Sequence, residues 1–192
     1  MKISLRYRIV LILCGLLMLC TSAYAADQLY RFMHNDHDAL IIGEITQIDE
    51  IGVKIRAVKS ITSARDLNKN YPKKQLKLSE AKIVLPFDYA GFHDENGSYI
   101  VEPHVGDYVL VSLEKVGNNF KVAWGAYKVN SLDYKNLSVV LPENAEVWSK
   151  MEAAAVGTFV NSDGRITEFA FDGDSKTVYV IKDEEEFVIY KE

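Results

Sequence analysis

Cysteine is absent from the chain after residue 20. The 192-residue sequence contains two cysteines, Cys14 and Cys20, and both lie close to the N-terminus. Residues 26–192 therefore cannot form a disulfide, supply a thiol nucleophile or bind a metal ion through thiolates. Their stability has to come from a hydrophobic core, which a chain of this length with 48% hydrophobic residues can form.

Familiar catalytic motifs are absent as well. The sequence has no G-x-S-x-G, no H-E-x-x-H, no phosphate-binding glycine loop and no G-x-G-x-x-G. A dispersed Ser/His/Asp site or a pair of carboxylates stays open, because such residues meet only in space. The sequence therefore predicts no cofactor and favours a protein that is not an enzyme.

A long apolar run is missing too, since the one from Ile9 to Cys20 covers only about a dozen residues and a membrane span needs roughly 20. Basic residues precede this run, and Ala23-Tyr24-Ala25 follows it as a small-x-small cleavage site. The sequence therefore predicts a signal peptide over residues 1–25, cleaved near Ala25. The protein is expected to be secreted or extracytoplasmic, with no transmembrane segment after cleavage.

Basic residues are too few for a general nucleic-acid-binding protein. Cleavage would remove Lys2, Arg6 and Arg8, which leaves 19 basic and 27 acidic residues and a net charge of −8. Affinity for nucleic acid comes largely from Lys and Arg that neutralise phosphates. The charge and the predicted export both argue against a nucleic-acid partner.

The clearest structural pattern is a hairpin between Val105 and Leu132. Apolar and polar residues alternate from Tyr108 to Val116, which is typical of a strand with one buried face. Gly117-Asn118-Asn119 then supplies residues that accept the positive φ of a tight turn. The sequence therefore predicts two long strands joined at this turn.

Gly125 interrupts the second strand of the hairpin. Phe120 and Tyr127 have opposite parity in the sequence, so one extra residue is needed to place both on one face. A glycine within a strand commonly marks a β-bulge, which inserts a residue and bends the strand. We therefore expect a bulge at Gly125, Phe120 and Tyr127 on one face, and a closed barrel rather than a flat sheet.

Five strands are predicted in total. They cover residues 39–48, 53–61, 76–85, 107–116 and 120–130. This spacing, together with Gly43, Gly125 and the Val105-Gly106-Asp107 start of the fourth strand, resembles the OB-fold, a five-stranded barrel. The resemblance covers roughly Ala39 to Leu132. It implies a binding face across the second and third strands and adjoining loops, formed here by Lys54, Arg56, Lys77 and Tyr89.

The remainder of the chain predicts a helix over residues 143–155, followed by short strands over 157–160, 165–171, 177–182 and 186–190. The fold class is therefore mainly β, with an OB-like barrel, a short helix and a C-terminal antiparallel meander. The expected organisation is a signal peptide (1–25), a barrel domain (26–135) and a helix plus meander (136–192). The last part either packs on the barrel or forms a small subdomain.

Two polar clusters are candidate sites. His34 and His37, with Asp36 and Asp38 alongside, are ligand types for zinc or another divalent metal, and Glu44, His93 or His104 would be needed to complete the site. The simpler interpretation is an exposed polar turn. The second cluster is a basic loop that surrounds Tyr71 in an otherwise acidic protein. It contains Arg65, Lys69, Lys73, Lys74 and Lys77.

The leading hypothesis is an exported, non-catalytic binding or interaction module for a peptide, glycan or protein ligand. Its expected ligand-binding residues are Lys54, Arg56, Tyr71, Lys73, Lys74, Lys77 and Tyr89. One alternative is a metal-dependent hydrolase that uses His34 and His37. Another is a structural or assembly protein whose exposed C-terminal strands pair with another chain.

One version of the leading hypothesis is that the basic loop holds an anionic polymer by charge attraction, and this version can be tested directly. Replacement of Lys73, Lys74 and Lys77 by alanine should weaken binding to an anionic cell-surface polymer, because attraction between opposite charges is lost. The measurement is the dissociation constant of the mature chain for that polymer. Unchanged binding in the triple variant, or no binding by the original protein, would rule out this version.

Overall fold

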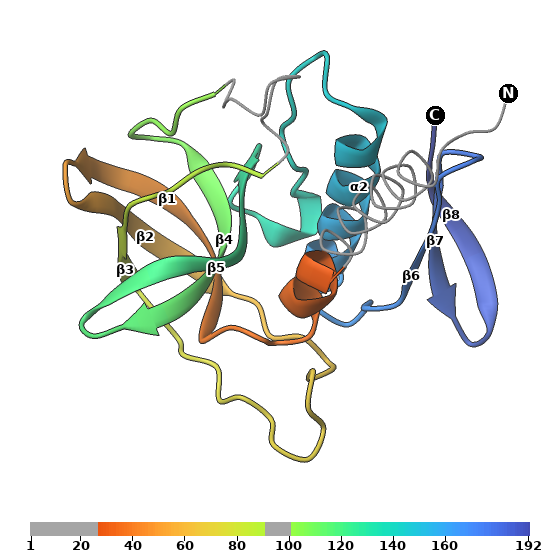
Figure 1. The fold of residues 1–192 in the computed structure, drawn as a ribbon, viewed down its shortest axis with the longest axis horizontal. Coiled ribbons are helices and arrows are strands. Elements are labelled where there is room, and N and C mark those ends of the chain that lie inside the picture. Colours follow the sequence, from red (N-terminus) through yellow and green to blue (C-terminus); the bar gives the residue numbers. More distant parts are fainter. Residues whose placement is uncertain (1–26, 91–100) are drawn as a thin grey trace, which may run out of the picture.

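The computed structural model describes residues 27–90 and 101–192 (Figure 1). The predicted signal peptide and His93 lie outside the described residues. Residues 27–33 are helical, and five strands follow. The strands are β1 (Ala39–Asp49), β2 (Gly52–Ser60), β3 (Glu80–Val84), β4 (Tyr108–Val116) and β5 (Asn119–Val129). A 3-10 turn (Tyr134–Asn136) and the helix α2 (Val147–Asn161) come next, and then strands β6 (Phe169–Asp172), β7 (Thr177–Lys182) and β8 (Glu185–Lys191).

The first five strands form a closed barrel in the order β1-β2-β3-β5-β4. Neighbouring strands are antiparallel except β3 and β5, which run parallel where Ile83 lies opposite Phe120. The predicted mainly β fold with a five-stranded barrel is thereby confirmed, and the barrel is compatible with an OB-like fold. The third strand is shorter than expected, because it begins at Glu80 and not at Leu76.

Aliphatic side chains fill the interior of the barrel. Their alternation along each strand turns every second residue inward, as the sequence pattern of β2 and β4 predicts. The fully buried interior residues include Ile41, Ile45, Val53, Ile55, Ile83, Val109, Val111 and Leu113. Glycine is required where β2 approaches β3: a Cβ on Gly52 would lie 2.0 Å from the carbonyl oxygen of Ile83.

The outer face of β1, β4 and β5 is buried as well. Leu40, Ile42, Leu110 and Val129 point away from the interior cluster and belong to a second core, shared with Leu29 and Phe32 of the N-terminal helix and with α2. Figure 1 shows the resulting three layers: the barrel, the two helices and the small sheet β6–β8 on the far side of α2. A strand that is buried on both faces contains a continuous run of apolar residues, such as ALII at the start of β1.

Strand β5 is irregular at Gly125, as predicted, but it contains two extra residues relative to β4 and not one. Leu113 pairs with Val122 whereas Val111 pairs with Ala126, and Gly125 has φ of 149°. Two extra residues leave the parity unchanged. Phe120 therefore lies inside the barrel and Tyr127 outside, so the expectation that they share a face is wrong. Phe120 is buried in the barrel interior, and Tyr127 is buried because helices cover the outer face of β5.

Helix α2 runs from Val147 to Asn161, later and longer than the predicted helix. The predicted strand over residues 157–160 is wrong, because these residues form its last turns. Met151, Ala155 and Phe159 recur at helical spacing and are buried in the second core. Gly157 lies within the helix, and a Cβ there would lie 3.9 Å from the carbonyl oxygen of Leu137.

The C-terminal sheet has three antiparallel strands in the order β6-β7-β8. Val178 and Val180 of β7 are buried, and Val178 belongs to the core that contains α2. The sheet thus packs on the helix, which in turn packs on the barrel. Within residues 27–90 and 101–192, no helix combines the length and the apolar character needed to cross a membrane.

The close approach at Gly52 predicts a large effect of a small substitution. Gly52→Ala should lower the free energy of unfolding by about 3 kcal/mol, because its methyl group would overlap the β3 backbone, which cannot rotate away. Chemical denaturation followed by circular dichroism measures the change.

The matched control is Gly173→Ala in the turn between β6 and β7, where a Cβ would meet no heavy atom of residues 27–90 and 101–192 within 4 Å. Its free energy of unfolding should differ from that of the original protein by less than about 0.5 kcal/mol. Equal stability of the two variants would contradict the packing argument at Gly52.

Candidate functional site

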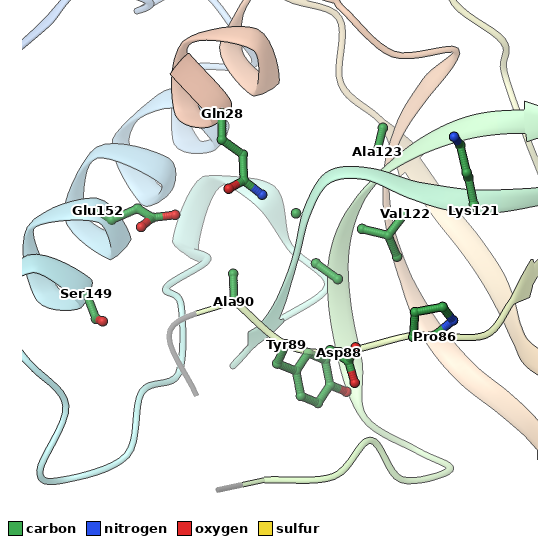
Figure 2. A pocket seen from close by; sticks show the side chains of 12 residues that line it. Gln28, Pro86, Asp88, Tyr89, Ala90, Lys121, Val122, Ala123, Ser149 and Glu152 are labelled. Carbon is green, nitrogen blue, oxygen red and sulfur yellow. The ribbon is translucent and has the colours of Figure 1, made fainter. Parts of the chain in front are cut away.

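A cleft of about 590 Å³ lies between the barrel and α2, and we call it the polar cleft (Figure 2). Four segments that are far apart in the sequence form its walls: the N-terminal helix, the segment after β3, strand β5 and α2. Its lining residues are Gln28, Pro86, Asp88, Tyr89, Ala90, Lys121, Val122, Ala123, Gly125, Ala126, Ser149 and Glu152. This volume falls in the range of small-ligand sites, roughly 300–1,000 Å³.

Glu152 is the chemically distinctive residue of the polar cleft. Its Oε1 accepts a hydrogen bond of 2.7 Å from the hydroxyl of the buried Tyr127. Burial raises the pKa of the Glu152 carboxyl, and the hydrogen bond from Tyr127 opposes this shift only in part. A carboxyl with a raised pKa in a cleft is a candidate for a functional role, because a positively charged group of a ligand could stabilise its ionised form.

Polar groups from other elements point into the same space. In Figure 2 the side chains of Gln28 and Glu152 extend from the two helices toward β5, with Ser149 one turn before Glu152 on α2. Asp88 lies on the opposite wall, and Lys121 stands at the far end of the cleft. The floor beside Gly125 has no side chain, and a Cβ there would lie 3.1 Å from the ring of Tyr127.

Tyr89 is the one predicted binding residue that lines the polar cleft, but its ring is fully buried. Its hydroxyl donates a 3.0 Å hydrogen bond to Asp107, which also pairs with Lys128 at 2.7 Å. Burial works against the charged form of Asp107, yet these partners and the N–H of His104 lower its pKa. Tyr89 therefore acts as a fixed wall of the cleft.

Lys54 and Arg56 lie on the outer surface of β2, where the OB-fold resemblance implies a binding face. Lys54 pairs with Glu80 at 3.0 Å, and Arg56 pairs with Glu44. Each cation is thus matched by an acid on a neighbouring strand. This surface is polar and charge-balanced, and it is separate from the polar cleft.

The other predicted binding residues lie in the loop between β2 and β3. Tyr71 is 81% exposed, and Lys73 pairs with Asp38 at 3.3 Å. Lys74 and Lys77 are exposed and make no ion pair with the described residues. The structure therefore distributes the seven predicted residues over three places: the surface of β2, this loop and the wall of the polar cleft.

The turn that contains His34 and His37 fastens this loop to the barrel. Asn35 has φ of 55°, and its amide donates to the carbonyl of Ser63 at 3.0 Å and to Asp66 at 2.9 Å. The N–H of Ser63 returns a 2.8 Å bond to the Asn35 side chain. These contacts give the polar turn a structural role.

Both histidines of this turn are buried, at 6% and 1% exposure, so the exposed-turn interpretation does not describe them. The Nδ1 of His34 is 2.7 Å from the carbonyl oxygen of Tyr30, on whose ring it stacks. Neither ring nitrogen of His37 has a hydrogen-bond partner in the described part of the chain. Among the described residues, no group of three or more His, Cys, Asp or Glu side chains is placed to hold a metal ion. The metal site at His34 and His37 stays a prediction.

A second, apolar cleft of about 180 Å³ lies beside the polar cleft, and we call it the aromatic cleft. The same two helices border both clefts: Gln28 and Ser149 line the polar one, and their neighbours Leu29 and Trp148 line the aromatic one. Its other lining residues are Tyr30, Met33, His34, Thr167, Phe169 and Phe171.

Comparison of the chain with protein-family models, with curated proteins and with solved structures gave no match. The site has therefore to be interpreted from its own geometry.

The sequence analysis missed Gln28, Ser149 and Glu152. One signal for Glu152 is present: it lies three and four residues from Ala155 and Trp148, within the apolar stripe of the predicted helix. An acid at such a position is either paired or functional. Gln28 and Ser149 carry no comparable signal, because only the packing of the helices brings them to the cleft.

The burial of His37 predicts a pH-dependent stability. Burial, and next the charge of Lys73, lowers its pKa to about 4, against about 6.5 in the unfolded chain. The unfolded state therefore binds the proton first as the pH falls. The stabilisation from a neutral His37 is complete above pH 6.5 and is lost between pH 6.5 and about 4, amounting to about 3 kcal/mol.

This dependence can be isolated with His37→Phe, measured as the free energy of unfolding from pH 7.5 to pH 4. The variant should show a shallower loss of stability than the original protein over that interval, whatever its absolute stability. His104→Gln at an exposed site should leave the curve unchanged. Parallel curves for His37→Phe and the original protein would contradict the assignment.

Proposed function

We propose that this protein is an exported, non-catalytic binding module that holds a peptide or protein segment with a basic side chain in the polar cleft. Export rests on the predicted signal peptide. The observation that carries the binding proposal is Glu152, a carboxyl with a raised pKa that faces a cleft of ligand size and whose hydrogen bond comes from Tyr127.

The charges around the cleft favour a cation as the group that enters it. Glu152 and Asp88 contribute two acids, while Lys121 contributes one base at the far end. A basic side chain beside Glu152 would favour the ionised carboxylate and so regain the interaction energy that burial removes. The acidic net charge of residues 26–192 would also attract a basic ligand.

The remaining lining suits a polypeptide better than a glycan. Gln28 and Ser149 can donate to and accept from peptide groups, and small residues leave room for a backbone next to β5. These small residues are Ala90, Ala123, Gly125 and Ala126. A sugar ring needs an accessible platform for its apolar face, whereas Tyr89, the one aromatic residue among the described lining residues, is fully buried.

The proposal can be tested by selecting binders from a random peptide library displayed on phage, using the mature chain as bait. The selected peptides should share a Lys or Arg. Glu152→Gln keeps the shape of the side chain but removes its charge, so it should weaken their binding about tenfold or more.

The matched control is Glu50→Gln, which removes an exposed carboxylate in the turn between β1 and β2. This variant should retain the original affinity. At a pH near the pKa of Glu152, binding should also release a proton from this carboxyl. Titration calorimetry in buffers of different ionisation enthalpy detects this release. Peptides without a basic residue, or equal binding by the two variants, would contradict the proposal.

A further inference from the structure

Strand β8 forms one edge of the C-terminal sheet. The sheet order β6-β7-β8 leaves β8 paired on one side only among the described residues. Phe187 and Val188 in its middle are 49% and 57% exposed. An edge strand of seven residues with exposed apolar side chains offers unpaired backbone groups to another strand.

The register with β7 shows which face each β8 side chain occupies, because directly opposed residues share a face. Phe187 and Tyr190 lie opposite the buried Val180 and Val178, so both are on one face of the sheet, the face on which Val178 and Tyr190 pack in the core with α2. Glu186 and Lys191 lie opposite Ile181 and Thr177, on the other face.

Because of a bulge in its middle, β8 can pair with a second copy of itself so that residues on the same face lie opposite each other. Val178 pairs with Tyr190 whereas Tyr179 pairs with Val188, so Ile189 is the extra residue. When a second β8 is placed antiparallel, about a two-fold axis between Val188 and Ile189, Phe187 of each copy opposes Tyr190 of the other. Each of these pairs then lies on the face toward α2.

The charged ends of the strand match in the same register. Glu186 of each copy lies opposite Lys191 of the other, on the outer face. Acids gather at the beginning of β8, from Asp183 to Glu186, and Lys191 stands at its end. An antiparallel pair brings opposite charges together at both ends, whereas a parallel pair would bring like charges together.

We propose that β8 is a self-association surface and that its partner is β8 of a second copy of this chain. The two three-stranded sheets then join into one continuous six-stranded sheet. The contact is isologous, since the same strand serves both copies, and it closes after two copies without leaving a free β8 edge. The dimer is expected to be reversible and concentration-dependent, because one strand edge buries little surface.

Cysteine cross-linking tests the geometry, because residues 26–192 contain no cysteine of their own. In the proposed dimer the two copies of residue 188 flank the axis on one face, within the Cα separation that a disulfide allows, about 4.4–6.8 Å. Val188→Cys should therefore form a covalent dimer on mild oxidation. Val116→Cys is the control, since Val116 is similarly exposed at 47% but lies in the closed barrel.

Charge reversal tests the register. Lys191→Glu places carboxylates opposite each other at both ends and should weaken dimerisation about tenfold or more, measured by analytical ultracentrifugation. Glu186→Lys combined with Lys191→Glu in one chain restores opposite charges and should recover the dimer. Circular dichroism verifies that both variants fold.

Three results would overturn the proposal: a monomer at every concentration, cross-linking of Val188→Cys no faster than that of Val116→Cys, or no recovery in the double variant. Each of these measurements is made without a peptide ligand, so either proposal can fail without the other.

Discussion

The burial of both faces of β1, β4 and β5 is the constraint on which the rest of this structure depends. The interior face closes the barrel, and the outer face, with Leu40, Ile42 and Leu110, has to be covered by something else. The N-terminal helix and α2 supply that cover. Their own apolar residues need burial on the side away from the barrel, and the sheet β6–β8 provides part of it. Each layer therefore exists because the previous one leaves apolar surface exposed.

Much of the fold could be predicted from the sequence, because the strands carry strong local signals. The alternation in β2 and β4 and the Gly-Asn-Asn turn before Phe120 lead directly to the barrel strands. Prediction failed where burial on two sides removes the alternation. Phe120 and Tyr127 lie on opposite faces of β5 and are both buried because both faces are covered, and the strand predicted over residues 157–160 is the end of a continuous helix.

The candidate site was much harder to predict, for a different physical reason. Charged residues such as Lys54 and Arg56 are easily chosen from a sequence as binding residues. On the surface of this protein, however, they form ion pairs with nearby acids, as many surface residues do. The polar cleft depends on helices that meet from opposite ends of the chain, and no local pattern reports such a meeting. Of its residues, Glu152 alone carries a signal in the sequence, as an acid within an apolar stripe, and this signal was missed.

Helix α2 has the barrel on one side and the sheet on the other, and this position links regions that share no residue. Glu152 on one side of the helix faces the polar cleft, and the core on the other side reaches Tyr190 of β8. A ligand that displaces α2 would therefore also displace the edge strand. By thermodynamic linkage, the affinity of the cleft and the association of two chains would then influence each other by the same factor.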